Sequence, residues 1–258
     1  MKIKTLLYTV AACLTAVTSC DTVGEDERYI EVTEIQPQRS VLLEDFTGQR
    51  CPNCPNAAIE IGRLQTAYPD SIIAVAIHGG PLALPALKSS VGDEYYAAVN
   101  SPNLPAGRID RRGETSVPDQ WQGLVYAAIQ KKDAVSMKIE SRYDGNTRTA
   151  NIKVSTYSTK DVTGKVQVWL VEDGITAIQA MPDGSNNREY VHNHVLRAAV
   201  NGAWGEEVSV GPGNSSESSY TTTIDNRWVA GNMNVVAFVY NDNGVVKVTT
   251  AALTPDAE

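Results

Sequence analysis

Residues 40–67 read SVLLEDFTGQRCPNCPNAAIEIGRLQTA, and the fold prediction starts from them. The stretch opens with a mostly apolar run at 40–46, which is long enough for a buried strand. Two cysteines separated by two residues follow the turn at 47–50, and apolar residues then recur at helical spacing until Pro69 ends the helix. A second apolar run occupies 71–77. The order strand, CxxC, helix, strand predicts the start of a βαβ unit.

The position of the two cysteines suits thiol chemistry. A cysteine at a helix N-terminus meets unpaired backbone N–H groups and the positive end of the helix dipole, and both favour the nucleophilic thiolate. Pro52 fits the first helical position because no N–H donor is needed there. The spacing puts Cys54 one turn deeper, within disulfide reach, and Arg50 adds positive charge beside Cys51. We predict Cys51 as the exposed attacking residue and Cys54 as the buried resolving residue.

Residues 45–54, DFTGQRCPNC, resemble the thioredoxin superfamily. The resemblance implies that Asp45 helps to deprotonate the resolving cysteine, Cys54. The chain departs from the family pattern at Arg50, where tryptophan is usual, and this departure leaves the activity open. The alternative is a passive disulfide at the start of a helix.

The same resemblance implies a cis-proline that faces the cysteines just before a strand. Pro105 is the best candidate, and Pro102 is the alternative. The gap between the cysteines and Pro105 is longer than in plain thioredoxins, so residues 79–103 look partly inserted. A helix expected over 118–132, with apolar side chains on one face, would complete a thioredoxin-like domain.

From about Ala134 the hydropathy pattern changes to a period of two residues. Roughly seven or eight short runs, separated by turn signals, predict an all-β sandwich. The Asn-Gly pair at 243–244 lies between two such runs and predicts a tight hairpin. The expected fold class is α/β plus all-β, with a thioredoxin-like domain at 40–133 followed by an immunoglobulin-like β-sandwich at 134–258.

The first twenty residues predict a targeting segment. Lys2 and Lys4 precede an apolar run at 6–17, the pattern of a signal peptide, which we place at 1–19. At roughly 12 residues the run is too short for a transmembrane helix, which needs about 20.

Residues 17–20 read Val-Thr-Ser-Cys, which resembles a relaxed bacterial lipobox. The resemblance implies that Cys20 becomes the first residue of the mature protein and carries the lipid. The alternative is a plain secretory signal cleaved nearby. The polar and acidic stretch that follows, within 20–39, predicts a tether or a surface-export signal. A lipid would anchor the protein to the membrane without spanning it.

Cysteine counting isolates one thiol pair. The chain has four cysteines, of which Cys13 lies in the predicted signal and Cys20 is the predicted lipid site. Cys51 and Cys54 alone then remain with free side chains in an oxidising compartment, as a self-contained redox pair.

Composition and the remaining motifs exclude several function classes. A formal net charge of −8 and a pI near 5.0 argue against nucleic-acid binding through a broad basic face. No cofactor is expected. His192 and His194 are expected on one face of a strand as a packed or hydrogen-bonded pair rather than as metal ligands, because no third ligand has matching spacing. Three tryptophans are expected to pack in or around the sandwich core, although they could also form a sugar-stacking platform: Trp169, Trp204 and Trp228.

The lipoprotein signal, the acidic tether and the stretches at 44–55 and 190–197 together resemble the twenty-eight-kilodalton outer-membrane lipoprotein family of Gram-negative anaerobes. The resemblance implies a lipid-anchored protein of the outer membrane, on its periplasmic or its surface face. The leading hypothesis is thiol–disulfide exchange on envelope proteins by Cys51 and Cys54, assisted by Asp45, with Pro105 docking the substrate backbone. The alternative is a non-enzymatic surface protein that binds a ligand or mediates adhesion, with the CxxC pair as a structural disulfide.

Overall fold

The computed structural model describes residues 39–255, which belong to one compact unit. The predicted signal peptide (1–19), the lipid site Cys20 and all but the last residue of the predicted tether lie outside the described residues. Within them the chain forms 13 strands and three α-helices, so the fold is mostly β.

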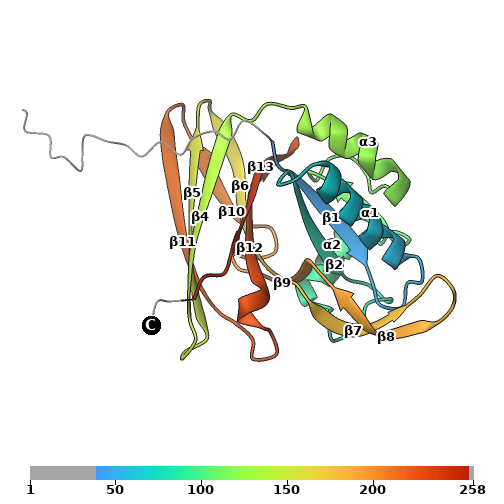
Figure 1. Cartoon of the computed structure of the whole chain (residues 1–258). Coiled ribbons are helices and arrows are strands. Elements are labelled where there is room, and N and C mark those ends of the chain that lie inside the picture. Colours follow the sequence, from blue (N-terminus) through green and yellow to red (C-terminus); the bar gives the residue numbers. More distant parts are fainter. Residues whose placement is uncertain (1–38, 256–258) are drawn as a thin grey trace, which may run out of the picture. The chain divides into compact units, whose positions relative to one another are not determined.

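An eight-stranded sheet forms the centre of the fold, in the order β13-β12-β6-β9-β2-β1-β3, with β10 also paired to β6 (Figure 1). Its strands are β1 (Val41–Thr47), β2 (Ile72–His78), β3 (Ala106–Ile109), β6 (Val162–Glu172), β9 (Val195–Ala199), β10 (Glu206–Val210), β12 (Met233–Asn241) and β13 (Gly244–Ala252). The strands β1 and β2 run parallel, and β3 pairs antiparallel with the other edge of β1.

The predicted fold class, a thioredoxin-like domain followed by an immunoglobulin-like sandwich, is wrong. The strands β1, β2 and β3 come from the first half of the chain, and β6, β9, β12 and β13 come from the second. They meet where β2 pairs with β9 through Ala76 and Val195, and the Ala76 N–H donates to the His194 carbonyl at 2.7 Å. One sheet therefore runs through both halves of the chain. The local sequence pattern does not indicate this, because it does not show which strand pairs with the free edge of β2.

The helices cover both faces of the β1–β2 part of this sheet. Helices α1 (Cys54–Ala67) and α3 (Pro118–Ile129) share an apolar core with the odd-numbered side chains of β1, such as Val41 and Leu43. Helix α2 (Ser90–Ala98) lies on the opposite face, where Tyr95 packs with Leu42 and Phe46. The helix expected over 118–132 is present but ends at Ile129.

The β-rich half adds a second layer. A three-stranded sheet in the order β11-β5-β4 packs against β6 and β12 through an apolar core, and β7 and β8 form a separate two-stranded sheet (Figure 1). These strands are β4 (Val135–Asp144), β5 (Thr149–Ser158), β11 (Asn214–Thr223), β7 (Ile175–Ala180) and β8 (Asn186–His192). The hairpin expected at Asn243–Gly244 joins β12 to β13, and Gly244 has a φ of +94°.

Candidate functional site

The two cysteines form a disulfide at the start of α1, with their Cα atoms 5.4 Å apart. The strand, CxxC, helix and strand occur in the predicted order, with β1 and β2 on either side of α1 in sequence. The helix begins at Cys54 rather than at Pro52, so Pro55 lies in its first turn. Cys51 therefore precedes the helix, and Cys54 is its first residue.

Both cysteines are buried, which corrects the expectation of an exposed Cys51. Cys51 is 2% exposed and Cys54 is 3% exposed. The residues around Cys51 are nevertheless at the surface, since Arg50, Pro52 and Asn53 are all exposed. The disulfide is therefore buried close to the protein surface, next to exposed residues of its own loop.

Two segments hold the cysteine loop in place. Gln179 of β7 donates its side-chain amide to the Cys51 carbonyl at 2.9 Å, and the Ala180 N–H donates to the Gln49 carbonyl at 2.8 Å. On the other side, the side chain of Gln49 accepts a hydrogen bond from the Leu84 N–H at 2.7 Å. The β7–β8 hairpin therefore packs directly against the cysteines, which the sequence pattern does not indicate.

A cavity of about 200 Å³ lies beside the disulfide on the Cys54 side. Its walls come from β1, α1, β2 and the β7–β8 hairpin, and Cys51 and Pro105 do not line it. The ionisable side chains in its lining are those of Asp45, Cys54, His78, Tyr190, His192 and His194.

Asp45 supplies a carboxyl group to the lining of this cavity. It lies on the α1 side of β1 and is 3% exposed, and no hydrogen-bond partner for Oδ1 is found within residues 39–255. Burial raises the pKa of Asp45 from about 3.8 to about 7, because the charged carboxylate loses its hydration without gaining a partner. The carboxyl therefore exchanges a proton near neutral pH.

Two histidines complete the polar lining. The rings of His78, at the end of β2, and His192, at the end of β8, pack edge to face with centroids 5.6 Å apart. Burial lowers the pKa of His78 to about 3 and that of His192 to about 4, so both imidazoles are neutral at neutral pH. The sequence analysis does not include His78 among the site residues. Its position at the end of the strand that follows the CxxC helix could have indicated that it lies near the cysteines.

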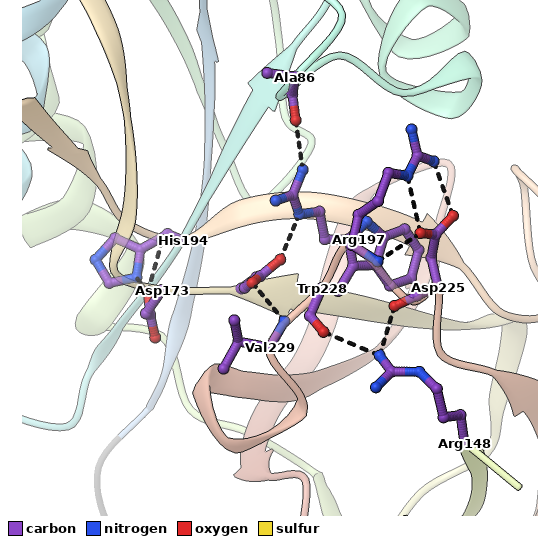
Figure 2. Close-up of polar contacts among 10 residues, drawn as sticks. Ala86, Arg148, Asp173, His194, Arg197, Asp225, Trp228 and Val229 are labelled. Carbon is purple, nitrogen blue, oxygen red and sulfur yellow. Dashed lines mark hydrogen bonds and ion pairs between the residues drawn. The ribbon is translucent and has the colours of Figure 1, made fainter. Parts of the chain in front are cut away.

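The expected pairing of His192 with His194 does not occur. Strand β8 ends at His192, and His194 has a φ of +60°. Figure 2 shows that His194 contacts Asp173 instead, with 3.2 Å between Nδ1 and the carboxylate. Arg197 donates to Glu172 at 2.7 Å. It also donates to the Ala86 carbonyl at 2.9 Å, as Figure 2 shows.

Pro105 lies where a strand begins, as expected. The Leu104–Pro105 peptide bond is cis, and Ala106, the first residue of β3, pairs with Phe46 of β1. Pro105 is partly buried. Its role in docking a substrate stays a prediction.

Two of the three tryptophans pack in or against the apolar cores. Trp169 is fully buried and Trp228 packs against the sandwich-like core, whereas Trp204 is 40% exposed. Within the described residues, no group of three or more His, Cys, Asp or Glu side chains is arranged to hold a metal ion. Across the same part of the chain, no helix has the length and apolar character to cross a membrane.

Comparison with known proteins identifies a family. Residues 92–257 match the family described as outer membrane protein Omp28. The structure resembles HBP35 of Porphyromonas gingivalis with a TM-score of 0.69 at 14% identity, over 87% of this chain and 79% of that one. It also resembles a protein of Agrobacterium tumefaciens with a TM-score of 0.50 at 15% identity, over 86% and 98% of the two chains.

A third similar structure is a domain of the outer membrane lipoprotein Omp28 from Porphyromonas gingivalis, with 27% identity and a TM-score of 0.36 over 48% of this chain and 92% of that one. No curated protein matches the chain significantly. The family match covers more than half of the 258 residues and begins after the cysteines. The chain therefore belongs to the Omp28 family of outer membrane proteins.

Proposed function

We propose that the Cys51–Cys54 pair carries out thiol–disulfide exchange with proteins of the cell envelope. One observation carries the proposal: Cys54 and the carboxyl of Asp45, whose pKa is raised by burial to about 7, line the same cavity. A proton donor and acceptor of that pKa beside a sulfur suits a thiol that must gain and lose its proton in each cycle. A purely structural disulfide has no use for such a group.

The exchange follows from the order of the two sulfurs. A substrate thiolate attacks Sγ of Cys51, which is buried but has exposed neighbours in the chain, and a mixed disulfide forms. The Cys51–Cys54 bond breaks, and the Cys54 sulfur leaves as a thiolate that takes the proton held by Asp45. A second substrate thiolate then attacks the substrate sulfur of the mixed disulfide, which releases Cys51 and leaves the substrate oxidised.

Access to Cys51 requires a small opening of its cover. The exposed residues Arg50, Pro52 and Asn53 would meet the substrate first, and the contact between Gln179 and the Cys51 carbonyl would have to lengthen. Pro105, whose peptide bond is cis, would support the substrate backbone. Arg50 would favour thiolate at Cys51 and an acidic residue near the substrate cysteine.

The second candidate is a surface-binding protein with a structural disulfide. The burial of both cysteines and the contact between Gln179 and Cys51 favour it, because they hold the loop closed. In that case the disulfide stabilises the start of α1, and the binding surface lies elsewhere on the molecule. Adhesion to a surface ligand belongs to this second candidate.

Trapping of mixed disulfides distinguishes the two. In the reverse direction, the Cys51 thiolate attacks a substrate disulfide, and the Cys54 thiolate then attacks Cys51 and releases the substrate as a thiolate. A Cys54→Ser variant, expressed in its native envelope, should therefore accumulate complexes linked through Cys51 that disappear on reduction, because the sulfur that releases the substrate is gone. The Cys51→Ser/Cys54→Ser double variant is the matched control. A Cys54→Ser protein that forms no more complexes than the double variant contradicts exchange and supports the structural disulfide.

Membership of the Omp28 family places the protein in the outer membrane of the cell envelope. We further propose that lipid on Cys20 anchors it there, on the basis of the lipobox-like residues 17–20. Metabolic labelling with a fatty acid should label the wild type and not a Cys20→Ala variant. Equal labelling of both, or outer-membrane fractionation of the variant, contradicts this anchor.

A further inference from the structure

A second cavity, of about 190 Å³, is lined by helix α2 and by strands β1, β3 and β12. Glu44 and Phe46 supply the β1 part of the lining, and side chains alternate along a strand, so this cavity lies on the opposite face of β1 from Asp45. Within the described residues, neither cysteine of the disulfide belongs to the lining. The cavity is therefore separate from the site of the proposed thiol–disulfide exchange.

Arg111 is a buried cation in this lining. Its side chain is 7% exposed, and Nε donates to Glu44 at 2.9 Å. The Cζ atom lies between 4.6 and 5.8 Å from the centroids of five aromatic rings, which belong to Tyr95, Trp169, Trp204, Phe238 and Tyr240. The guanidinium of Arg111 thus already occupies the aromatic box that would otherwise suit a cationic ligand.

The backbone is strained where it delivers this side chain. Asp110 and Arg111 have φ values of +52° and +54°, in the left-handed region that disfavours residues with a Cβ atom. Asp110 has a structural reason, because its carboxylate accepts a hydrogen bond from the Leu42 N–H at 3.0 Å and pairs with Arg39. The strain at Arg111 brings its guanidinium to Glu44 and the aromatic rings, and such strain is concentrated at functional sites.

Arg108 of β3 gives the cavity a second positive charge. Its side chain is partly buried, and Nε donates to the Gly113 carbonyl at 3.1 Å. Among residues 39–255, no carboxylate lies within ion-pair distance of Arg108. The lining also holds two acidic residues, but Glu44 is paired with Arg111, and Asp242 is exposed so that water screens its charge. The inner part of the cavity therefore favours an anion.

The remaining walls suit a small apolar body. Ala98 and Val99 line one side, and the rings of Trp204 and Tyr240 line another. Trp204 is 40% exposed, so a ligand can reach its ring from solvent. The volume is below the roughly 300–1,000 Å³ of pockets for drug-sized ligands, so one ring or a short chain fits.

We propose that this cavity binds a small free carboxylic acid with an aromatic or short aliphatic body. Arg108 donates to the carboxylate, since the guanidinium fork matches the two carboxylate oxygens. Trp204 and Tyr240 pack against the body of the ligand. Arg111, fixed by Glu44 and the aromatic rings, supplies the positive potential at the inner end.

Calorimetric titration of the wild-type mature protein with three ligands of the same body tests the charge preference. 3-Phenylpropionate should bind with a Kd of about 1 mM or tighter, a modest affinity for a ligand of eleven non-hydrogen atoms. 3-Phenylpropanol lacks the carboxylate and 3-phenylpropylamine reverses the charge, so each should bind at least about tenfold more weakly. Equal binding of all three, or no saturable binding of the acid, overturns the proposal.

A peptide terminus could offer the same ring and carboxylate. Gly-Gly-Phe should bind more weakly than 3-phenylpropionate, because the cavity is too small for the added chain. Tighter binding of the peptide overturns the assignment to a free acid.

Variants locate the site. Arg108→Gln should weaken binding of 3-phenylpropionate about tenfold or more and leave binding of 3-phenylpropanol unchanged, a difference that a general loss of structure would not produce. Trp204→Ala should weaken binding of both ligands, and Trp204→Phe should restore most of the affinity because it keeps a ring. Arg188→Gln, at an exposed position of β8 outside the lining, is the control for the charge change. An Arg108→Gln protein that binds the acid as tightly as the Arg188→Gln protein overturns the proposal.

Discussion

At the residue scale, the central feature is the buried carboxyl group of Asp45, whose charged form is destabilised by the loss of hydration. Asp45 is almost fully buried on a strand whose neighbouring side chains on the same face, such as Leu43, pack in an apolar core. A buried carboxylate without a partner is destabilising, so the group is held mainly in its neutral form below pH 7. A core built for stability alone would have an apolar residue here.

Asp45→Asn should raise the stability of the oxidised protein relative to wild type as the pH increases. The pKa of Asp45 is raised in the folded state, so the folded protein binds the extra proton, and its stability falls as pH rises from about 4 through about 7. The slope from this one group is at most about 1.4 kcal/mol per pH unit. The Asp45→Asn variant has no carboxyl at this position, so this part of the decrease in stability with rising pH should be absent.

Urea unfolding at pH 5, 6, 7 and 8 measures the difference between the two proteins. The difference matters because His78 and His192 act in the opposite direction: their pKa values are lowered in the folded state, so their contribution is lost as pH falls below about 6.5. A difference that stays constant over this range would show that Asp45 is ionised in the folded protein.

At the scale of elements, the loop before α1 is fixed by close backbone packing. A Cβ atom on Gly48 would lie 2.7 Å from the backbone carbonyl carbon and oxygen of Leu82. Gly48 follows β1 directly, so this approach fixes where the cysteine loop leaves the sheet. Glycine at this position is required by space rather than by a left-handed backbone.

Gly48→Ala should destabilise the protein by roughly 1–3 kcal/mol, because neither backbone can move without disturbing the cysteine loop. Gly62→Ala in α1 is the matched control, since no atom lies within 4 Å of its added Cβ. The control should be neutral or more stable by up to about 1 kcal/mol, because alanine favours a helix. Equal effects of the two substitutions in thermal unfolding would contradict the close packing.

At the scale of the whole molecule, the described residues form one folding unit. The β2–β9 pairing makes the sheet continuous, and a buried ionic network links Arg39, two residues before β1, to Lys247 of β13 through Asp133. Arg39 pairs with Asp110 at 2.7 Å and also with Asp133, which binds Lys247 of β13 at 2.9 Å. Removing one member of such a network leaves an uncompensated buried charge.

A single unfolding transition is therefore expected for the oxidised protein. Tryptophan fluorescence and far-UV circular dichroism should give the same urea midpoint, because Trp121 and Trp169 report on the two halves of one sheet. A fragment that ends at residue 133 should remain unfolded, since it exposes the edge of β2 and loses β13 and β9. Two separate midpoints, or a folded fragment, would contradict this view.

Local features of this fold could be predicted from the sequence, and long-range ones could not. The strand, CxxC, helix and strand order follows from periodicity, and the Asn243–Gly244 hairpin follows from turn chemistry. The β2–β9 pairing could not be predicted, because hydrophobic periodicity identifies strands but not the strand that each edge pairs with. The predicted sandwich failed for this reason.

The candidate site also has parts that could be predicted from the sequence and parts that could not. The disulfide is predicted from the spacing of the two cysteines, and Asp45 is predicted from the resemblance of residues 45–54 to the thioredoxin superfamily. The contact between His78 and His192 joins residues more than one hundred positions apart, and no local pattern indicates it. The burial of Cys51 under the β7–β8 hairpin was missed because that hairpin belongs to the other half of the chain.

The reduction potential of the Cys51–Cys54 pair tests the central claim most directly. It is measured by glutathione titration of the mature protein at pH 7, with thiols counted by alkylation and mass. Exchange with envelope proteins predicts a potential above about −270 mV, in the range of labile disulfides. A potential below about −300 mV, with Cys51 unreactive towards alkylation at neutral pH, would identify a structural disulfide and contradict the account.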